Sequence, residues 1–290
     1  MVDDHSGGHI RYTTVPVYRR RKRNVVPLQL SPSSISVFRQ CRQRYKFLYV
    51  DKLGDKYGRA RPYFTMANHI HATVKDFLSL HPVRLRTIAA IEKLLQRNWQ
   101  RYHVGFRDDQ DEMRWQEKAL AQLRAFVANH NVSVRPVMME EFLTAEITPG
   151  LVLRGRIDRV DRESNDSLHI IDYKTGNMPP EIDWTQLELH ALILSRRLPW
   201  PVSRVSYLYL APSLMSSAEI STERLTQAHW ELLNTARKIR RERKFRPSPG
   251  PRCGNCDFLS ICPGKTEAQP LATTEGQLEL WDDLGDDWGK

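Results

Sequence analysis

The chain has 290 residues, of which 40% are hydrophobic and 27% charged, a composition typical of a globular protein with a full hydrophobic core. No apolar run approaches the roughly 18 residues of a membrane-spanning helix, and the polar start is unlike a signal peptide, so we expect a cytoplasmic protein with no membrane partner. The net charge of +10 and the pI near 9.6 favour a polyanionic partner such as nucleic acid.

The two ends of the chain differ in charge. Residues 1–30 carry six Arg and Lys against two acids, whereas residues 263–290 carry two against seven. We interpret residues 1–28 as a disordered basic arm, which either contacts phosphate or only aids solubility. Residues 265–290 are interpreted as an acidic flexible tail. One domain is expected between them, over residues 29–264.

The first expected helix covers about residues 32–49. Ser31 is a suitable N-cap, and Pro32 suits the first helical position. Apolar side chains recur at spacings of three and four, with Cys41 among them: Ile35, Phe38, Tyr45 and Leu48. A cysteine in such a stripe is more often a small buried hydrophobe than a ligand.

Further helices are expected over residues 63–80 and within a helical insert at residues 83–130. His71 lies on the inner face of the first of these, where a single histidine is usually a core residue. Trp99, Tyr102 and Phe106 lie in the insert among basic residues and could stack on unpaired bases. Because aromatic residues at helical spacing more often pack in a core, we assign no site there.

A hairpin follows a strand-like run at residues 134–147. Its strands, residues 151–161 and 168–173, flank a polar turn. Side chains alternate between the faces of a strand, which puts Asp158 on a polar face and puts Asp172 and Lys174 on one side together. Two carboxylates and an ammonium suit Mg²⁺ or Mn²⁺ and phosphodiester hydrolysis, although the hairpin alone is explained as well by a surface salt bridge.

The remaining elements are a helix at 182–195, a strand at 202–210 and a helix from about 227. The first helix places Gln186 and His190 one turn apart on one face. The last ends in a basic run at 237–244, which suits the helix dipole or a phosphate track.

Three of the four cysteines form a C-x2-C-x5-C pattern, Cys253, Cys256 and Cys262, and Cys41 is the fourth. In a cytosolic chain this clustering indicates a metal site before disulfides. Zinc would favour two C-x2-C pairs or Cys/His pairs.

The segments 155–161 (GRIDRVD) and 172–176 (DYKTG) resemble the GxxDRxD and DYKTG motifs of RecB-family PD-(D/E)XK nucleases. Residues 31–49, 67–71 and 186–190 resemble three further motifs of its iron–sulfur members, which include AddB and the CRISPR-associated exonucleases. Ala67 stands where that family has glycine, and His190 where it has tyrosine.

The resemblance implies an α/β fold with a restriction-endonuclease-like core, a central mixed sheet flanked by helices. It implies that Asp158, Asp172, His71 and the backbone carbonyl of Tyr173 hold Mg²⁺ or Mn²⁺, with His69 a lesser candidate than His71. Glu140 or Glu141 would approach the metal from the preceding strand, and Glu141 is our choice. Lys174 would complete catalysis, with Gln186 and His190 assisting.

The resemblance also implies that Cys41, Cys253, Cys256 and Cys262 ligate a [4Fe–4S] cluster that staples the two ends of the domain. The expected function is a metal-dependent DNA nuclease, acting on single strands or ends, in repair, recombination or replication. A catalytically inactive DNA-binding module and a zinc-stapled adaptor are the competing interpretations.

The acidic tail contains one short motif. The sequence Gln277-Leu278-Glu279-Leu280-Trp281 resembles the Q-L-x-L-F peptide with which bacterial replication and repair proteins bind the sliding clamp. The resemblance implies that Gln277, Leu278, Leu280 and Trp281 would contact that partner.

Overall fold

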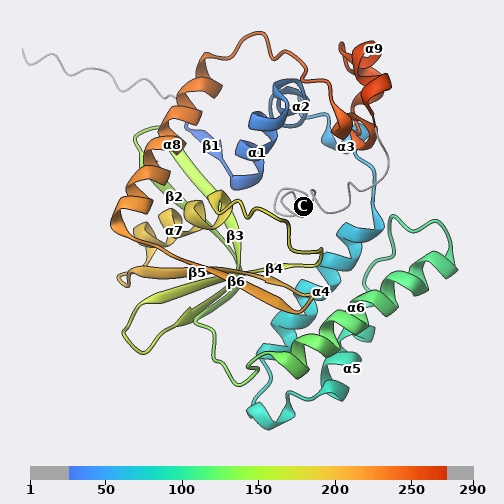
Figure 1. The fold of residues 1–290 in the computed structure, drawn as a ribbon, viewed down its shortest axis with the longest axis vertical. Helices are drawn as coiled ribbons and strands as arrows, with labels where there is room; N and C mark the ends of the chain where they lie inside the picture. The colour runs from blue at the N-terminus through green and yellow to red at the C-terminus, as the bar shows by residue number, and fades with distance from the viewer. Residues whose placement is uncertain (1–25, 273–290) are drawn as a thin grey trace, which may run out of the picture.

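The structure, a computed structural model, describes residues 26–272 (Figure 1). Most of the basic arm and the expected clamp-binding residues Gln277, Leu278, Leu280 and Trp281 lie outside the described residues. None of the helices in residues 26–272 is both long enough and apolar enough to cross a lipid bilayer.

The centre of the fold is a mixed, six-stranded sheet in the order β1-β3-β4-β5-β6, with β2 paired to β3. The pairs β1–β3 and β4–β5 are parallel, and the other pairs are antiparallel. The strands are β1 Leu28–Leu30, β2 Met138–Thr148, β3 Leu151–Arg162, β4 Leu168–Lys174, β5 Val202–Tyr209 and β6 Leu214–Glu219.

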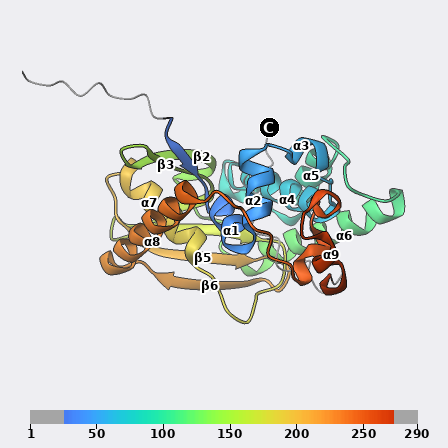
Figure 2. The same ribbon diagram turned by 90° about the horizontal axis from the view of Figure 1, so that it is seen from above.

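Helices cover both faces of the sheet (Figures 1 and 2). On one face, α4, α5 and α6 pack on Ile171, Tyr173 and Leu208; on the other, α7 packs on Ile170 and neighbouring strand residues. The helices are α1 Pro32–Gln40, α2 Arg42–Tyr45, α3 Gly54–Tyr57, α4 Pro62–Leu78, α5 Ile88–Trp99, α6 Asp109–Asn129, α7 Thr185–Arg197, α8 Thr222–Arg241 and α9 Lys265–Ala268. The predicted central mixed sheet flanked by helices is confirmed.

The first predicted helix is interrupted at Cys41. The backbone of Cys41 is extended (φ −156°, ψ 112°), and the N–H of Cys41 donates to the carbonyl of Val37. Helix α1 therefore ends at this residue, and α2 begins after it. A π-helical turn, Lys46–Val50, follows. The sequence pattern also did not predict the short strands β1 and β6. It predicted that α8 begins at about residue 227, five residues after its observed start at Thr222.

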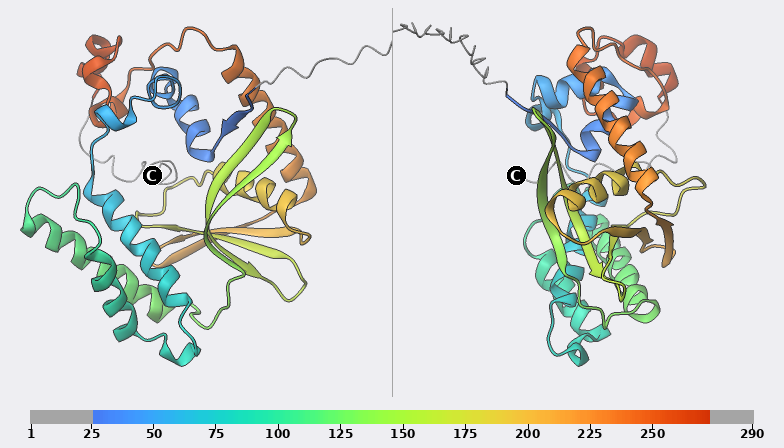
Figure 3. Two further views of the ribbon diagram at one scale, coloured as in Figure 1. Left: turned by 180° about the vertical axis from the view of Figure 1, so that it is seen from behind. Right: turned by 90° about the vertical axis from the view of Figure 1, so that its left-hand side faces the viewer.

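Helices α1 and α2 lie beside the C-terminal segment, residues 242–272, although about 200 residues separate them (Figures 1 and 3). Phe47 and Phe258 pack with ring centroids 5.3 Å apart, and Arg42 pairs with Glu242 at 2.7 Å. The two ends of the domain therefore close on each other.

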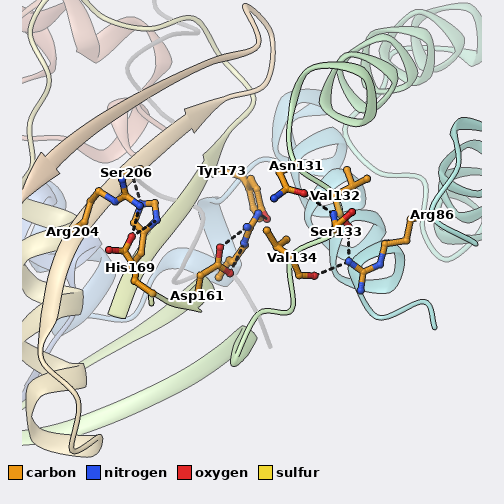
Figure 4. Close-up of polar contacts among 12 residues, drawn as sticks. Arg86, Asn131, Val132, Ser133, Val134, Asp161, His169, Tyr173, Arg204 and Ser206 are labelled. Atoms are coloured by element: carbon orange, nitrogen blue, oxygen red, sulfur yellow. Dashed lines mark hydrogen bonds and ion pairs between the residues drawn. The ribbon is translucent and has the colours of Figure 1, made fainter. Parts of the chain in front are cut away.

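Arg86 docks the helical insert on the rest of the domain (Figure 4). Its guanidinium donates to the carbonyls of Val132 and Val134, at 2.5 and 2.7 Å, and to that of Leu78 at 2.6 Å. A buried cation is stabilised when its donors are satisfied in this way. The end of α4 and the chain leading into β2 are thereby held together.

Candidate active site

The site begins where β3 and β4 separate. β1 pairs with β3 over Leu151–Leu153 and β4 pairs with it over Arg159–Arg162, so within the described sheet residues 154–158 have no strand partner on this edge. Here the side chain of Asp158 accepts a hydrogen bond from the backbone N–H of Tyr173 at 2.9 Å. A side chain thus replaces a ladder hydrogen bond, and polar groups gather in the opening.

The first group of polar side chains is His71, Glu140 and Asp158. His71 Nδ1 lies 3.0 Å from Glu140 Oε1 and 3.5 Å from Asp158 Oδ1. One potential ligand atom from each residue lies within 4.8 Å of the other two. α4, β2 and β3 each supply one residue, so the group exists only in the folded protein.

Glu140, and not Glu141, is the glutamate beside His71 and Asp158. The register pairs Met139 with Arg159 and Glu141 with Ile157, which puts Glu140 opposite Asp158, and cross-strand neighbours share a face of a sheet. Glu141 is exposed. Glu140 has a positive φ of 49°, a local irregularity that simple strand alternation did not predict. The structure therefore brings Glu140, rather than Glu141, beside His71 and Asp158, and which glutamate binds the metal stays a prediction.

The charges of this group stabilise one another. Burial raises the pKa of Asp158, but the attraction of His71 and the hydrogen bonds from His71 and Tyr173 outweigh it and lower the pKa to about 2. Burial lowers the pKa of His71, but Asp158 and Glu140 outweigh it and raise the pKa well above its ordinary value. A nitrogen and several carboxylate oxygens in this space form the kind of donor set that Mn²⁺ or Mg²⁺ takes.

The second group is Asp172, Lys174 and Gln186. Lys174 Nζ lies 3.1 Å from Asp172 Oδ2 and donates to Gln186 Oε1 at 2.9 Å. Gln186 Nε2 in turn donates to Asp172 Oδ1 at 2.9 Å. Gln186 on α7 therefore contacts both Asp172 and Lys174. These two side chains lie on one face of β4, as strand alternation predicts.

Members of both groups line a single pocket of about 370 Å³, and Glu140 is not among the residues that line it. Asp158, Asp172 and Lys174 line it together with His71 and Gln186. Further cations from three segments also line it, namely Arg44, Arg59, Arg61 and Arg156. Such a pocket combines acidic groups that suit a divalent ion with cations that suit phosphate oxygens. Tyr173 also lines the pocket, and the role of its carbonyl stays a prediction.

His190 is close to the site but is not among the residues that line the pocket. It is fully buried on α7, and its Nε2 would lie 2.9 Å from a Cβ at Gly155. Neither ring nitrogen has a hydrogen-bond partner among the described residues. Burial lowers the pKa of His190 to about 4, so the ring is neutral at neutral pH, and its catalytic role stays a prediction. His69 is also buried, and it contacts the carbonyl of Tyr102.

The four cysteines all line a second, small pocket, at the junction of α1, α2 and the C-terminal segment. All four are unbridged by disulfides. Among the described residues, the one group of three potential metal-binding atoms within 4.8 Å of one another is that of His71, Glu140 and Asp158. Four thiols around one pocket form a donor set that suits either a zinc ion or an iron–sulfur cluster.

Sequence reasoning missed the contacts that join the two pockets. Arg44 lines both of them, and Arg61 donates to Asp257 and to the carbonyl of Asn255, at 2.6 and 2.9 Å. Asn255 and Asp257 flank Cys256 and line the larger of these two pockets. No local pattern could have revealed pairs separated by almost 200 residues.

Comparison with known proteins gave two findings. The family model described as the PD-(D/E)XK nuclease superfamily matches residues 29–263. The crystal structure of SSO0001 is similar at 15% identity, with 85% of this chain and 89% of that chain covered and a TM-score of 0.39. No curated protein matched.

Proposed function

Because the chain belongs to the PD-(D/E)XK nuclease superfamily, we propose that it is a divalent-metal-dependent DNA nuclease that acts on single strands or strand ends in repair, recombination or replication. The observation that carries the proposal is the convergence of His71, Asp158, Asp172 and Lys174 on one pocket lined with arginines, with Glu140 beside His71 and Asp158. Members of this superfamily are typically nucleases that use Mg²⁺ or Mn²⁺.

Each group has a distinct chemical part in this proposal. Asp158, with Glu140, His71 and Asp172, would hold the metal ion, which supplies Lewis acidity and activates water when bound. Lys174 would orient the attacking water or stabilise charge that develops on the phosphate. Gln186 would fix the position of Lys174, since it contacts both Lys174 and Asp172.

The direct test is digestion of end-labelled single-stranded and double-stranded DNA with Mn²⁺ by the wild type and by Lys174→Ala. We expect cleavage by the wild type and a loss of at least about a hundredfold in the variant. Lys93→Ala, at an exposed lysine of α5 that does not line the pocket, is the matched control. DNA binding without cleavage by the wild type would instead favour the catalytically inactive binding module.

We further propose that the four cysteines hold a [4Fe–4S] cluster. The proposal is supported by the resemblance to the iron–sulfur nucleases and by the position of all four cysteines around one small pocket. Burial raises the pKa of Cys256 and of Cys262, so binding as thiolates would release protons. Absorption in the visible range together with iron and sulfide analysis of anaerobically purified protein separates the cluster from zinc.

We also propose that the acidic tail recruits the protein to the sliding clamp. The support for this is the sequence of the motif at residues 277–281. A pull-down of the clamp by the full chain, abolished by Gln277→Ala, is the expected result. Equal capture by both proteins would argue against the motif.

A further inference from the structure

The loop between α5 and α6, residues 100–108, forms part of the wall of the catalytic pocket. It passes beside the N-terminal end of α4 (Figure 1). Tyr102 and Val104 line the pocket together with Asp158 and Lys174. The helical insert thus brings an aromatic side chain to the place where the nucleic acid would react.

Tyr102 belongs to a row of stacked rings. Its ring centroid lies 4.3 Å from that of His69 at an interplanar angle of 22°, and His69 lies 4.6 Å from Trp99 at 27°. Trp99 continues the row to Phe106 at 6.0 Å and 21°. His69 and Trp99 are buried, whereas Tyr102 is half-buried and lines the pocket. The pocket therefore contains the accessible member of a preformed aromatic stack.

The loop that carries Tyr102 is fixed against α4. Thr65 donates to the carbonyl of Val104 at 2.7 Å, and the His69 ring contacts the carbonyl of Tyr102 at 3.2 Å. Gly105 has a φ of +87°, and a Cβ there would lie 2.6 Å from the carbonyl carbon of Arg61. A ring held in place before binding loses little entropy when a ligand stacks on it.

The electrostatics of this wall suit a nucleotide. Arg59, Arg61 and Arg156 line the same pocket and would attract phosphate. Burial raises the pKa of Tyr102, against a smaller opposing effect of Asn68, so its hydroxyl is uncharged at neutral pH. An uncharged aromatic ring among cations is the combination that binds single strands through bases and backbone together.

We propose that Tyr102 is a stacking platform for an unpaired base of single-stranded DNA in the catalytic pocket. The proposal rests on the proposed nuclease function. In a duplex, neighbouring bases already cover both faces of each base, so the platform favours unpaired nucleotides. Tyr102 would thereby select the substrate, while the metal-binding group and Lys174 act on the phosphate.

The test uses the full chain with Lys174→Ala, which prevents cleavage, and a short single strand that contains one 2-aminopurine. Stacking quenches the fluorescence of this base, so we expect quenching on binding. Adding Tyr102→Leu should abolish the quenching and weaken single-strand affinity about tenfold. Tyr102→Phe, which keeps the ring, should retain both. Thermal melting of each variant checks that it folds.

An unchanged affinity and quenching in folded Tyr102→Leu protein would overturn the platform. If that variant does not fold, Tyr102→Met takes its place, because its flexible side chain fills the space without a ring. If the wild type shows no Mn²⁺-dependent cleavage but the Lys174→Ala protein still quenches 2-aminopurine, the nuclease function is refuted and the stacking platform is retained. Cleavage by the wild type with no effect of Tyr102→Leu on quenching would refute the platform alone.

Discussion

The carboxylate of Asp158 accepts a 2.9 Å hydrogen bond from the backbone N–H of Tyr173, at the point where β3 and β4 cease to pair. This bond replaces a strand–strand contact and places Asp158 beside His71 and Glu140. Asp172 and Lys174 lie on either side of Tyr173 in β4, so their side chains share the opposite face of the strand. Both contact Gln186 on α7. One local irregularity thus arranges two polar groups around the same pocket.

Glu140 and Glu141 form a matched pair of variants. Glu140→Gln removes a negative charge beside His71 and Asp158, so we expect Mn²⁺ affinity, measured by calorimetry, to fall about tenfold or more. Glu141→Gln changes an exposed side chain and should leave the affinity as it is. The reverse pattern would show that the glutamate near the metal is Glu141.

Replacement of Gln186 by leucine should lower kcat with little change in DNA affinity. Gln186 contacts Lys174 and Asp172, and small displacements of catalytic groups can cost about a hundredfold in rate. Gln227→Leu, on the exposed part of α8, is the control. Single-turnover cleavage with excess enzyme measures the chemical step, and an unchanged rate in Gln186→Leu would remove this residue from the catalytic scheme.

Acidification should destabilise the wild type more than His190→Leu. The pKa of His190 is lowered from 6.5 to about 4 by burial, so between these values the unfolded chain takes up a proton that the folded protein does not. Stability is therefore fully present above pH 6.5 and falls as the pH decreases toward 4, by at most about 3 kcal/mol for this residue.

The measurement is urea unfolding of both proteins at several pH values between those limits. His69 and His169, whose pKa values burial also lowers to about 4, remain in both proteins; His169 contacts Ser206 (Figure 4). The difference between the two proteins therefore isolates His190. Parallel pH profiles would contradict the assignment of a neutral, buried ring.

Cys256→Ala should give colourless protein of lower stability. The cysteines lie where α1 and α2 meet the C-terminal segment, and the binding energy of the proposed cluster would contribute to folding. Because Asn255 and Asp257 line the catalytic pocket, single-strand binding should weaken as well. Ser260→Ala, an exposed neighbour, is the control. A brown Cys256→Ala protein with normal melting would contradict the cluster ligation.

Short-range pattern in the sequence determined the core of the site. Strand alternation placed Asp172 and Lys174 on one face, helical spacing placed Gln186 and His190 together, and the family motifs indicated the nuclease superfamily. These features depend on periods of two and 3.6 residues, which a sequence displays directly.

Only the tertiary structure decided which groups meet. The choice between Glu140 and Glu141 depended on the register of β2 against β3 and on the positive φ of Glu140. The approach of Arg61 to Asp257 and the entry of Tyr102 into the pocket depended on how the chain ends close and how the insert docks. Such contacts are set by packing between distant segments, which no local period encodes.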